Sequence, residues 1–162
     1  MKILLLVRHA KSSWDDPAMT DFDRPLNERG KKDAPAMADK LIARGITVDS
    51  FISSPAKRAK KTAKIFSQAF KRKEEEIILV PELYLASSGV FESVLASIES
   101  DSETIALFSH NPGITDFANT LTAARIDDIP TCGIFAVSID TDDWKNFRAA
   151  KKEFLFFDYP KA

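Results

Sequence analysis

An arginine and a histidine stand side by side directly after the first apolar segment of the chain. Five apolar residues, Ile3 to Val7, precede Arg8 and His9 without a spacer. A short continuous apolar run of this kind predicts a strand buried on both faces, as in a parallel sheet. The carboxyl edge of such a sheet is where open α/β proteins bind ligands. We therefore interpret His9 as a nucleophile and Arg8 as a phosphate-binding residue. The alternative is a terminal strand followed by a polar turn.

A second candidate, Arg58, follows the next predicted strand, residues 48–53. Ser54 is predicted to cap the helix that comes next, and Pro55 suits its first turn. Arg58 lies one turn into this helix, near its positive end. The alternative is that Arg58 is one more surface charge on a basic helix, which also carries Lys57, Lys60, Lys61 and Lys64.

The third candidate is His110, which directly follows the strongly apolar residues 104–109. A histidine after a strand is often only a polar capping residue. The chain has 2 histidines, however, and both come directly after predicted buried strands. That joint pattern favours a functional interpretation.

These residue types suit phosphoryl transfer. The charge of a transferring phosphoryl group is spread over three oxygens, so catalysis depends on positioning and on charge stabilisation. Arginine binds two oxygens at once and stays protonated. Arg8, Arg58 and His110 are therefore candidates for a phosphate pocket that needs no metal. His9 can be neutral near pH 7, since an unperturbed histidine has a pKa of about 6.5. A backbone carbonyl acceptor would fix its tautomer.

The order of predicted elements is β-α-β-α-β-α-β-α-β-β, which indicates an α/β three-layer sandwich with helices on both faces of a mostly parallel sheet. The short connection between the last two strands suggests an antiparallel pairing at one edge. Right-handed crossovers bring the loops after the first, second and fourth strands to one sheet edge. The predicted strands are 3–7, 48–53, 77–80, 104–109, 133–139 and 152–157, and the helices 28–44, 55–70, 90–98 and 114–121.

Composition indicates an ordinary globular protein, with residues 1–162 as a single domain. Hydrophobic residues make up 44% and charged residues 29% of the chain, and the formal net charge is −1. That charge gives no support for binding to nucleic acid or to an anionic membrane. No apolar segment reaches the ~20 residues of a membrane span. The single cysteine, Cys132, is expected to be a small buried residue, and the chain is expected in the cytoplasm.

Taken together, the motifs resemble those of the histidine phosphatase superfamily, also called the phosphoglycerate mutase-like family. They are Arg8-His9, Ser53-Ser54-Pro55 with Arg58, Ser109-His110-Asn111-Pro112, and Asp23-Arg24-Pro25-Leu26 with Gly30. Within the family the chain most resembles the small SixA-type phosphohistidine phosphatases. The resemblance implies a phosphoglycerate mutase-like fold, phosphorylation of His9, and a phosphate pocket of Arg8, Arg58 and His110. It implies neither a metal nor another cofactor.

One departure from the family pattern bears on the substrate. Many members carry a glutamate, which protonates the leaving oxygen, two residues after a leucine that here is Leu83; Leu85 holds that place. Glu82 is close but offset. A poor alkoxide leaving group needs a proton donor, commonly worth ~100-fold or more in rate, whereas a leaving imidazole can already be protonated. The first loop offers other possible acids, namely Asp15, Asp16, Asp21 and Asp23.

The sequence therefore predicts a metal-independent phosphatase that acts on phosphohistidine in proteins. One alternative is a small-molecule phosphomonoesterase of the same superfamily. The other is a catalytically silent module that binds phosphate or a protein. The expected partner is a phosphoprotein or a small phosphorylated substrate, with no nucleic acid and no membrane. The physiological substrate and the oligomeric state stay open.

Overall fold

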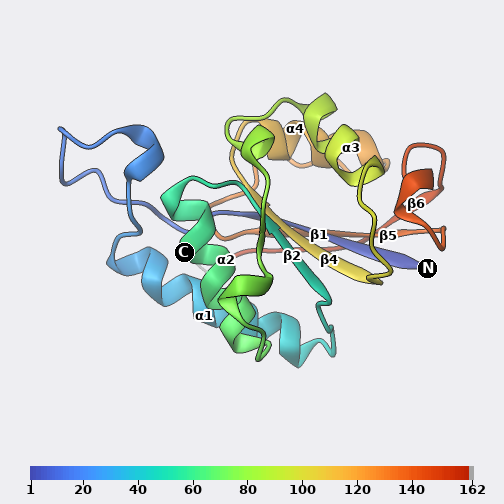
Figure 1. Ribbon diagram of the computed structural model, residues 1–162, viewed down its shortest axis with the longest axis horizontal. Helices are drawn as coiled ribbons and strands as arrows, with labels where there is room; N and C mark the ends of the chain where they lie inside the picture. Colours follow the sequence, from blue (N-terminus) through green and yellow to red (C-terminus); the bar gives the residue numbers. More distant parts are fainter. Residues whose placement is uncertain (161–162) are drawn as a thin grey trace.

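A six-stranded sheet forms the central layer of the protein (Figure 1). The structure is a computed structural model, and it describes residues 1–160. Within these residues the strand order is β3-β2-β4-β1-β5-β6. The strands are β1 (Lys2–Arg8), β2 (Ser50–Ser53), β3 (Ile78–Leu79), β4 (Thr104–Ser109), β5 (Ile134–Ile139) and β6 (Lys152–Asp158).

The sheet is mostly parallel, as predicted. β1 pairs in parallel with β4, β4 with β2, and β2 with β3. β5 runs antiparallel to both β1 and β6, so the last two strands form an antiparallel pair at one edge. The strand that reverses direction is β5, and β6 completes the edge. The connection between them, residues 140–151, contains no α-helix, whereas a parallel crossover usually runs through one.

Two helices cover each face of the sheet, which confirms the predicted three-layer arrangement. In Figure 1, α1 (Glu28–Ala43) and α2 (Lys57–Ala69) lie below the sheet, and α3 (Ser88–Ala96) and α4 (Gly113–Leu121) lie above it. Alternate residues of one strand therefore enter different cores.

The central strand β1 shows this alternation. Leu4 and Leu6 belong to the core under α3 and α4, whereas Leu5 and Val7 belong to the core under α1 and α2. All four side chains are fully buried. This double burial explains why β1 is a continuous apolar run, and it fixes the position of the residues that follow it.

The start of α1 agrees with the prediction, whereas the start of α2 does not. The Asn27 side chain caps α1 by accepting a hydrogen bond of 2.9 Å from the Gly30 amide. The predicted cap of α2 by Ser54 is wrong, because α2 begins at Lys57 and its first flanking residue is Ala56. The Ser54 hydroxyl has a different partner, described below.

Other element boundaries differ from the predictions by a few residues at most, with β2 and β3 each two residues shorter than expected. Among residues 1–160, no helix is both long enough and apolar enough to cross a membrane.

Candidate active site

The carboxyl ends of β1, β2 and β4 meet at one edge of the sheet and surround a cavity. In the parallel register Arg8 lies opposite Ser109, and Ser53 lies opposite Phe108. The residues that follow these strands are therefore neighbours, as the topology predicts. The cavity has a volume of about 370 Å³ and is lined by Arg8, His9, Lys11, Ser12, Trp14, Asp21, Arg24, Arg58, Leu85, His110, Asn111 and Thr131.

His9 is buried at the base of this cavity with its tautomer fixed. Its Nδ1 lies 2.7 Å from the carbonyl oxygen of Ala10, and a carbonyl only accepts, so Nδ1 carries the proton. Nε2 then has a free lone pair, and it accepts a hydrogen bond of 3.3 Å from Arg58 Nε. The ring centroid of His110 is 5.2 Å away. The predicted backbone acceptor is present, and Nε2 is the unprotonated ring nitrogen that faces the cavity.

Arg58 points into the cavity and not to solvent. Only 3% of its surface is exposed, so the alternative that it belongs to the basic outer face of α2 is wrong. Its Nη1 donates to the backbone carbonyl of Asp21 at 2.6 Å, and its Nη2 pairs with the Asp21 carboxylate at 3.0 Å. One guanidinium therefore bridges His9 and the first loop.

The Asp21 carboxylate also binds two other side chains. Arg24 donates to it through Nη2 at 3.1 Å, and the Tyr84 hydroxyl donates to it at 2.6 Å. The Arg24 guanidinium lies 3.5 Å from the ring centroid of Trp14 and donates to the Ser12 hydroxyl at 2.6 Å. The first loop is thus fixed in place at the wall of the cavity by charge-assisted hydrogen bonds.

Two buried nitrogen atoms of the site have no hydrogen-bond partner in the described part of the chain: Arg8 Nε and His110 Nδ1. The other end of the Arg8 guanidinium is held, since Nη1 donates to the Ile129 carbonyl at 2.9 Å and lies 3.7 Å from the Asp128 carboxylate. Buried polar groups are normally paired, and an unpaired one costs about 1–3 kcal/mol. An oxyanion in the cavity would supply acceptors.

The hydroxyl of Ser54 holds His110 in place. His110 Nε2 lies 2.7 Å from Ser54 Oγ, and the Tyr84 ring packs edge-on against the imidazole with centroids 5.5 Å apart. The motif that resembled a helix start is therefore part of the site. Ser54 orients the second histidine, and its hydroxyl also accepts a hydrogen bond of 3.3 Å from the Ala56 amide just before α2.

Burial keeps both imidazoles neutral in the ligand-free protein. It lowers the pKa of His9 to about 3, and the neighbouring His110, Arg58 and Arg8 lower it further, against the hydrogen bond to Ala10. Burial likewise lowers the pKa of His110 to about 3, assisted by the charge of Arg58. A neutral His9 suits a nucleophile. His110 is then a neutral imidazole and not a third cation.

The candidate acids separate clearly. Of the four aspartates proposed from the sequence, Asp21 alone lines the cavity. The hydrogen bond from Tyr84, with smaller contributions from Arg58 and Arg24, lowers the pKa of Asp21 to about 2, so this carboxylate is ionised in the ligand-free protein. Glu82 lines a different cavity, beside α3. Leu85 does line the catalytic cavity and is 59% exposed.

Sequence reasoning gave no functional role to Arg24, Tyr84 or Asn111. Arg24 had a signal, because it belongs to a family-like stretch with Pro25. Tyr84 had none, since its bond to Asp21 joins residues 63 positions apart in a loop without a motif. Asn111 lines the cavity, and its side-chain amide donates to the Ile129 carbonyl at 3.1 Å. The same carbonyl accepts the hydrogen bond from Arg8.

Cys132 supports the site through its backbone. Its amide lies 3.0 Å from the carbonyl oxygens of Arg8 and His9, with a φ of 62°. The thiol is buried, and burial raises its pKa well above the usual range. The expectation of a small buried residue is confirmed. Among residues 1–160, no group of three or more His, Cys, Asp or Glu side chains is placed to hold a metal ion.

The fold is that of an α/β protein, and its cavity brings two histidines and three arginines together at the carboxyl edge of the sheet. Comparison with known families agrees: the model of the histidine phosphatase superfamily (branch 1) matches residues 4–127. The chain belongs to this superfamily. An uncharacterised chloroplastic protein of Arabidopsis thaliana is 33% identical over 150 residues, which cover 88% of this chain and 68% of that protein.

Solved structures of SixA proteins resemble the chain over nearly its whole length. One, from Agrobacterium tumefaciens and assigned as a SixA phosphohistidine phosphatase, superposes with a TM-score of 0.81 at 28% identity and covers 99% of both chains. The protein histidine phosphatase SixA in complex with tungstate superposes with a TM-score of 0.82 at 19% identity, over 97% of this chain and 96% of that one. The family and the SixA-like fold support phosphatase activity.

Proposed function

We propose that the protein is a phosphatase that forms a phosphohistidine intermediate on His9 and that its substrate is phosphohistidine in proteins. The observation that carries this proposal is the pair of unpartnered buried nitrogens, Arg8 Nε and His110 Nδ1. Both belong to residues that line the same cavity as the Nε2 lone pair of His9. A tetrahedral anion is the ligand that pairs these donors and presents phosphorus to the nucleophile.

In the first step His9 Nε2 attacks phosphorus, and the Nε2–P bond forms as the P–N bond of the substrate breaks. The electron pair of that bond returns to the substrate imidazole, which leaves as a neutral ring because its other nitrogen carries a proton. In the second step water attacks phosphorus, the Nε2–P bond breaks with its electron pair returning to Nε2, and inorganic phosphate leaves with the oxygen and both protons of water. The arginines stabilise the charge on the equatorial oxygens in both steps, so the proposal includes no metal.

The preference for a P–N bond rests on the acids of the cavity. Leu85 stands where many relatives carry a glutamate, and it has no proton to give. Asp21 is ionised, since its pKa lies near 2. A phosphate ester with an alkoxide leaving group would lack a proton donor, whereas an imidazole leaving group does not require one.

A substrate panel tests the proposal. The purified protein is incubated with a histidine-containing phosphotransfer domain phosphorylated on histidine, with phosphoglycerate and with a sugar phosphate, and released phosphate is measured. We expect kcat/KM for the phosphohistidine protein to exceed that for the esters by about 100-fold, the usual contribution of a proton donor. Rapid hydrolysis of an unactivated ester, with the phosphohistidine protein inert, would overturn the substrate assignment.

The variant His9→Ala tests the nucleophile. We expect it to lose both turnover and the acid-labile phosphoenzyme that trapping detects in the wild type. A variant that still turns over, or a wild type that binds phosphate without ever forming a phosphoenzyme, would contradict the mechanism. The second outcome would indicate a silent phosphate-binding module.

A further inference from the structure

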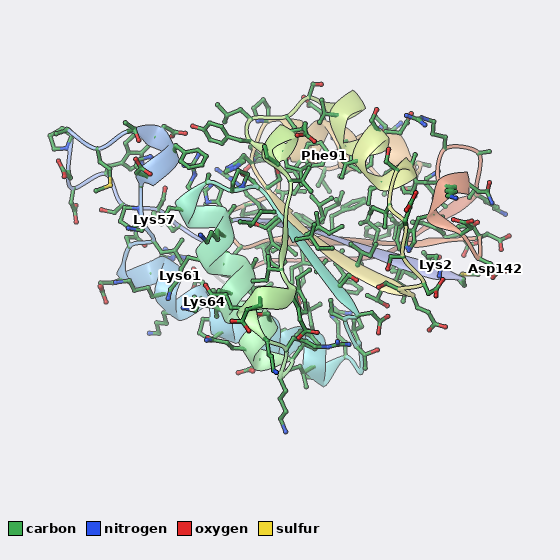
Figure 2. The ribbon with its side chains drawn as sticks, in the orientation of Figure 1. Lys2, Lys57, Lys61, Lys64, Phe91 and Asp142 are labelled. Carbon is green, nitrogen blue, oxygen red and sulfur yellow. The ribbon has the colours of Figure 1, made fainter. Side chains whose placement is uncertain are left out.

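A second cavity, of about 540 Å³, lies beside the catalytic one and is not used by the mechanism above. It is bounded by the outer face of α2 and by the first loop. Figure 2 shows Lys57, Lys61 and Lys64 in succession along α2. We call this cavity the lysine groove; its main lining residues are Lys57, Lys60, Lys61, Lys64, Phe22 and Pro25.

The lysine groove and the catalytic cavity share one wall. Asp21 and Arg24 face the catalytic cavity, whereas Phe22 and Pro25, their neighbours in the chain, line the groove. The same division occurs at the start of α2, where Arg58 faces inward and Lys57 lines the groove. A macromolecule that presents a phosphoryl group to His9 would therefore extend across this wall into the groove.

The groove is lined by more lysines than carboxylates, since Asp23 and Glu74 are the only acidic residues that line it among residues 1–160. Lys57, Lys60 and Lys61 are exposed and form no ion pair with any described residue. Lys64 does form one, with Glu74 at 3.4 Å. The chain as a whole has a formal net charge of −1, so this cationic surface is local. Its complement is an acidic surface.

An aromatic side chain stands at the border between the two cavities. Phe22 is 38% exposed and packs edge-on against Tyr84, with ring centroids 5.0 Å apart. Exposed aromatic residues are typical of the centre of a protein interface, and charged residues of its rim. The groove thus combines an apolar contact next to the site with cations further out.

We propose that the lysine groove is the docking surface for the substrate protein, and that it binds an acidic face next to the phosphorylated histidine. This inference rests on the proposed function. The occupant is the phosphohistidine-carrying protein itself: its phosphoryl group enters the catalytic cavity, an apolar residue contacts Phe22, and its carboxylates face Lys57, Lys60 and Lys61. Small phosphorylated molecules fill the catalytic cavity alone and do not reach the groove.

The test is a charge reversal on the exposed face of α2. Lys60→Glu/Lys61→Glu changes two lysines that are outside the catalytic machinery. The matched control is Lys145→Glu/Lys151→Glu, which makes the same change in charge. Lys145 lines a cavity with Asp142, which lies at the opposite end of the molecule from α2 in Figure 2.

Each protein is assayed with two probes. One is a phosphotransfer domain with an acidic face, phosphorylated on histidine, and the other is phosphoramidate, which has the same P–N bond and no protein surface. We expect Lys60→Glu/Lys61→Glu to lower kcat/KM for the phosphorylated domain about tenfold or more at low salt, mainly through KM, because electrostatic steering is lost. Its phosphoramidate activity and the control variant stay within about twofold of wild type. At about 0.5 M salt the difference in kcat/KM between the wild type and the α2 variant becomes smaller, because salt screens the charges.

The outcomes separate this inference from the proposed function. If the wild type hydrolyses the phosphorylated domain and the α2 variant does so equally well, the docking surface is overturned and the phosphatase assignment stands. An equal loss on both probes also overturns it, because the effect would then be on the catalytic cavity. If the wild type hydrolyses neither probe, both proposals fail.

Discussion

Arg58 is the residue on which the geometry of the site converges. Its Nε faces the lone pair of His9 at 3.3 Å, and both of its terminal nitrogens are held by Asp21. In the ligand-free protein this guanidinium therefore lies on the side of His9 that carries the Nε2 lone pair. Under the proposed mechanism, a bound substrate would replace this hydrogen bond of Arg58 with bonds to phosphate oxygens. Asp21 limits how far the guanidinium can move.

Replacing Arg58 with lysine tests this bridging geometry. An ammonium is a point charge and cannot face His9 and the two Asp21 acceptors together, so we expect Arg58→Lys to lower kcat by about 100-fold although the charge is kept. Steady-state release of phosphate from a phosphohistidine protein measures the effect. The control is Arg148→Lys, at an exposed arginine that pairs with Glu92. Activity of Arg58→Lys near that of the control would show that charge alone is required.

Leu85 offers a gain-of-function test of the missing acid. The side chain lines the catalytic cavity and is 59% exposed, so a glutamate fits there without being buried. We expect Leu85→Glu to raise kcat/KM for a sugar phosphate by about 10- to 100-fold, since a positioned proton donor is worth that much. Activity toward phosphohistidine should change little.

Leu85→Gln is the control for that substitution, because it has a similar shape and no acidic proton. Comparable gains in both variants would mean that polarity or space, and not proton donation, limits ester hydrolysis. A gain confined to glutamate, falling off as pH rises above its pKa, would support the absence of a proton donor as the cause of the substrate preference.

At the scale of elements, the first loop is held against α1 by one close backbone approach. A Cβ added to Gly30 would lie 2.2 Å from the carbonyl oxygen of Lys11, the same oxygen that accepts a 3.0 Å hydrogen bond from the Asn27 amide. The loop between these residues carries Asp21 and Arg24. A side chain at position 30 therefore acts on the site without touching it.

We expect Gly30→Ala to destabilise the protein by about 1–3 kcal/mol, as overpacking does, and to lower kcat/KM at the same time. Urea unfolding and phosphate release measure the two effects. Gly89→Ala is the matched control, because nothing lies within 4 Å of a Cβ added at this position in α3. Stability of Gly30→Ala equal to that of Gly89→Ala would show that the loop yields without cost.

The elements that sequence reasoning predicted well are those defined by continuous burial. β1 and β4 are apolar along most of their length because helices cover both faces of the sheet. The ends of these two apolar runs could therefore be read from the sequence, and His9 and His110 directly follow the two strands. The start of α2 was harder to predict. Ser54-Pro55 has the composition of a helix start, but the hydroxyl of Ser54 is bound to an imidazole 56 positions away. A contact at that separation leaves no local signal.

The same limit applies to the first loop of the molecule. From the sequence alone there was no reason to prefer one of the four aspartates of this loop. In the folded protein the Asp21 carboxylate binds Arg24, Arg58 and Tyr84. The Asp23 carboxylate instead accepts a hydrogen bond of 2.8 Å from the Thr20 hydroxyl. The resemblance to the family identified the stretch around Arg24, but it did not identify Asp21 as the carboxylate that Arg24 binds. Long-range side-chain contacts of this kind determine which carboxylate lines the cavity, and they depend on tertiary packing.

For the molecule as a whole, the two buried histidines link stability to pH. Both folded-state pKa values are about 3, whereas an unfolded histidine titrates at about 6.5. Between these values the unfolded chain binds more protons than the folded protein. The free energy of unfolding therefore falls as pH decreases below about 6.5, by up to about 1.4 kcal/mol per pH unit for each histidine. Above about pH 7.5 the histidines contribute no further change.

Urea unfolding between pH 4.5 and 8, in a buffer without phosphate, measures this slope. The range stays above the ordinary pKa of an aspartate, 3.8, from which that of Asp21 is lowered to about 2, so protonation of Asp21 contributes little to the slope. The double variant His9→Asn/His110→Asn lacks both imidazoles and should show a much shallower decline below pH 6.5, whatever its stability at pH 8. Equal slopes in the two proteins would mean that the imidazoles of the folded protein bind protons at the same pH as those of the unfolded chain. The proposal that His9 is neutral in the folded protein would then be wrong.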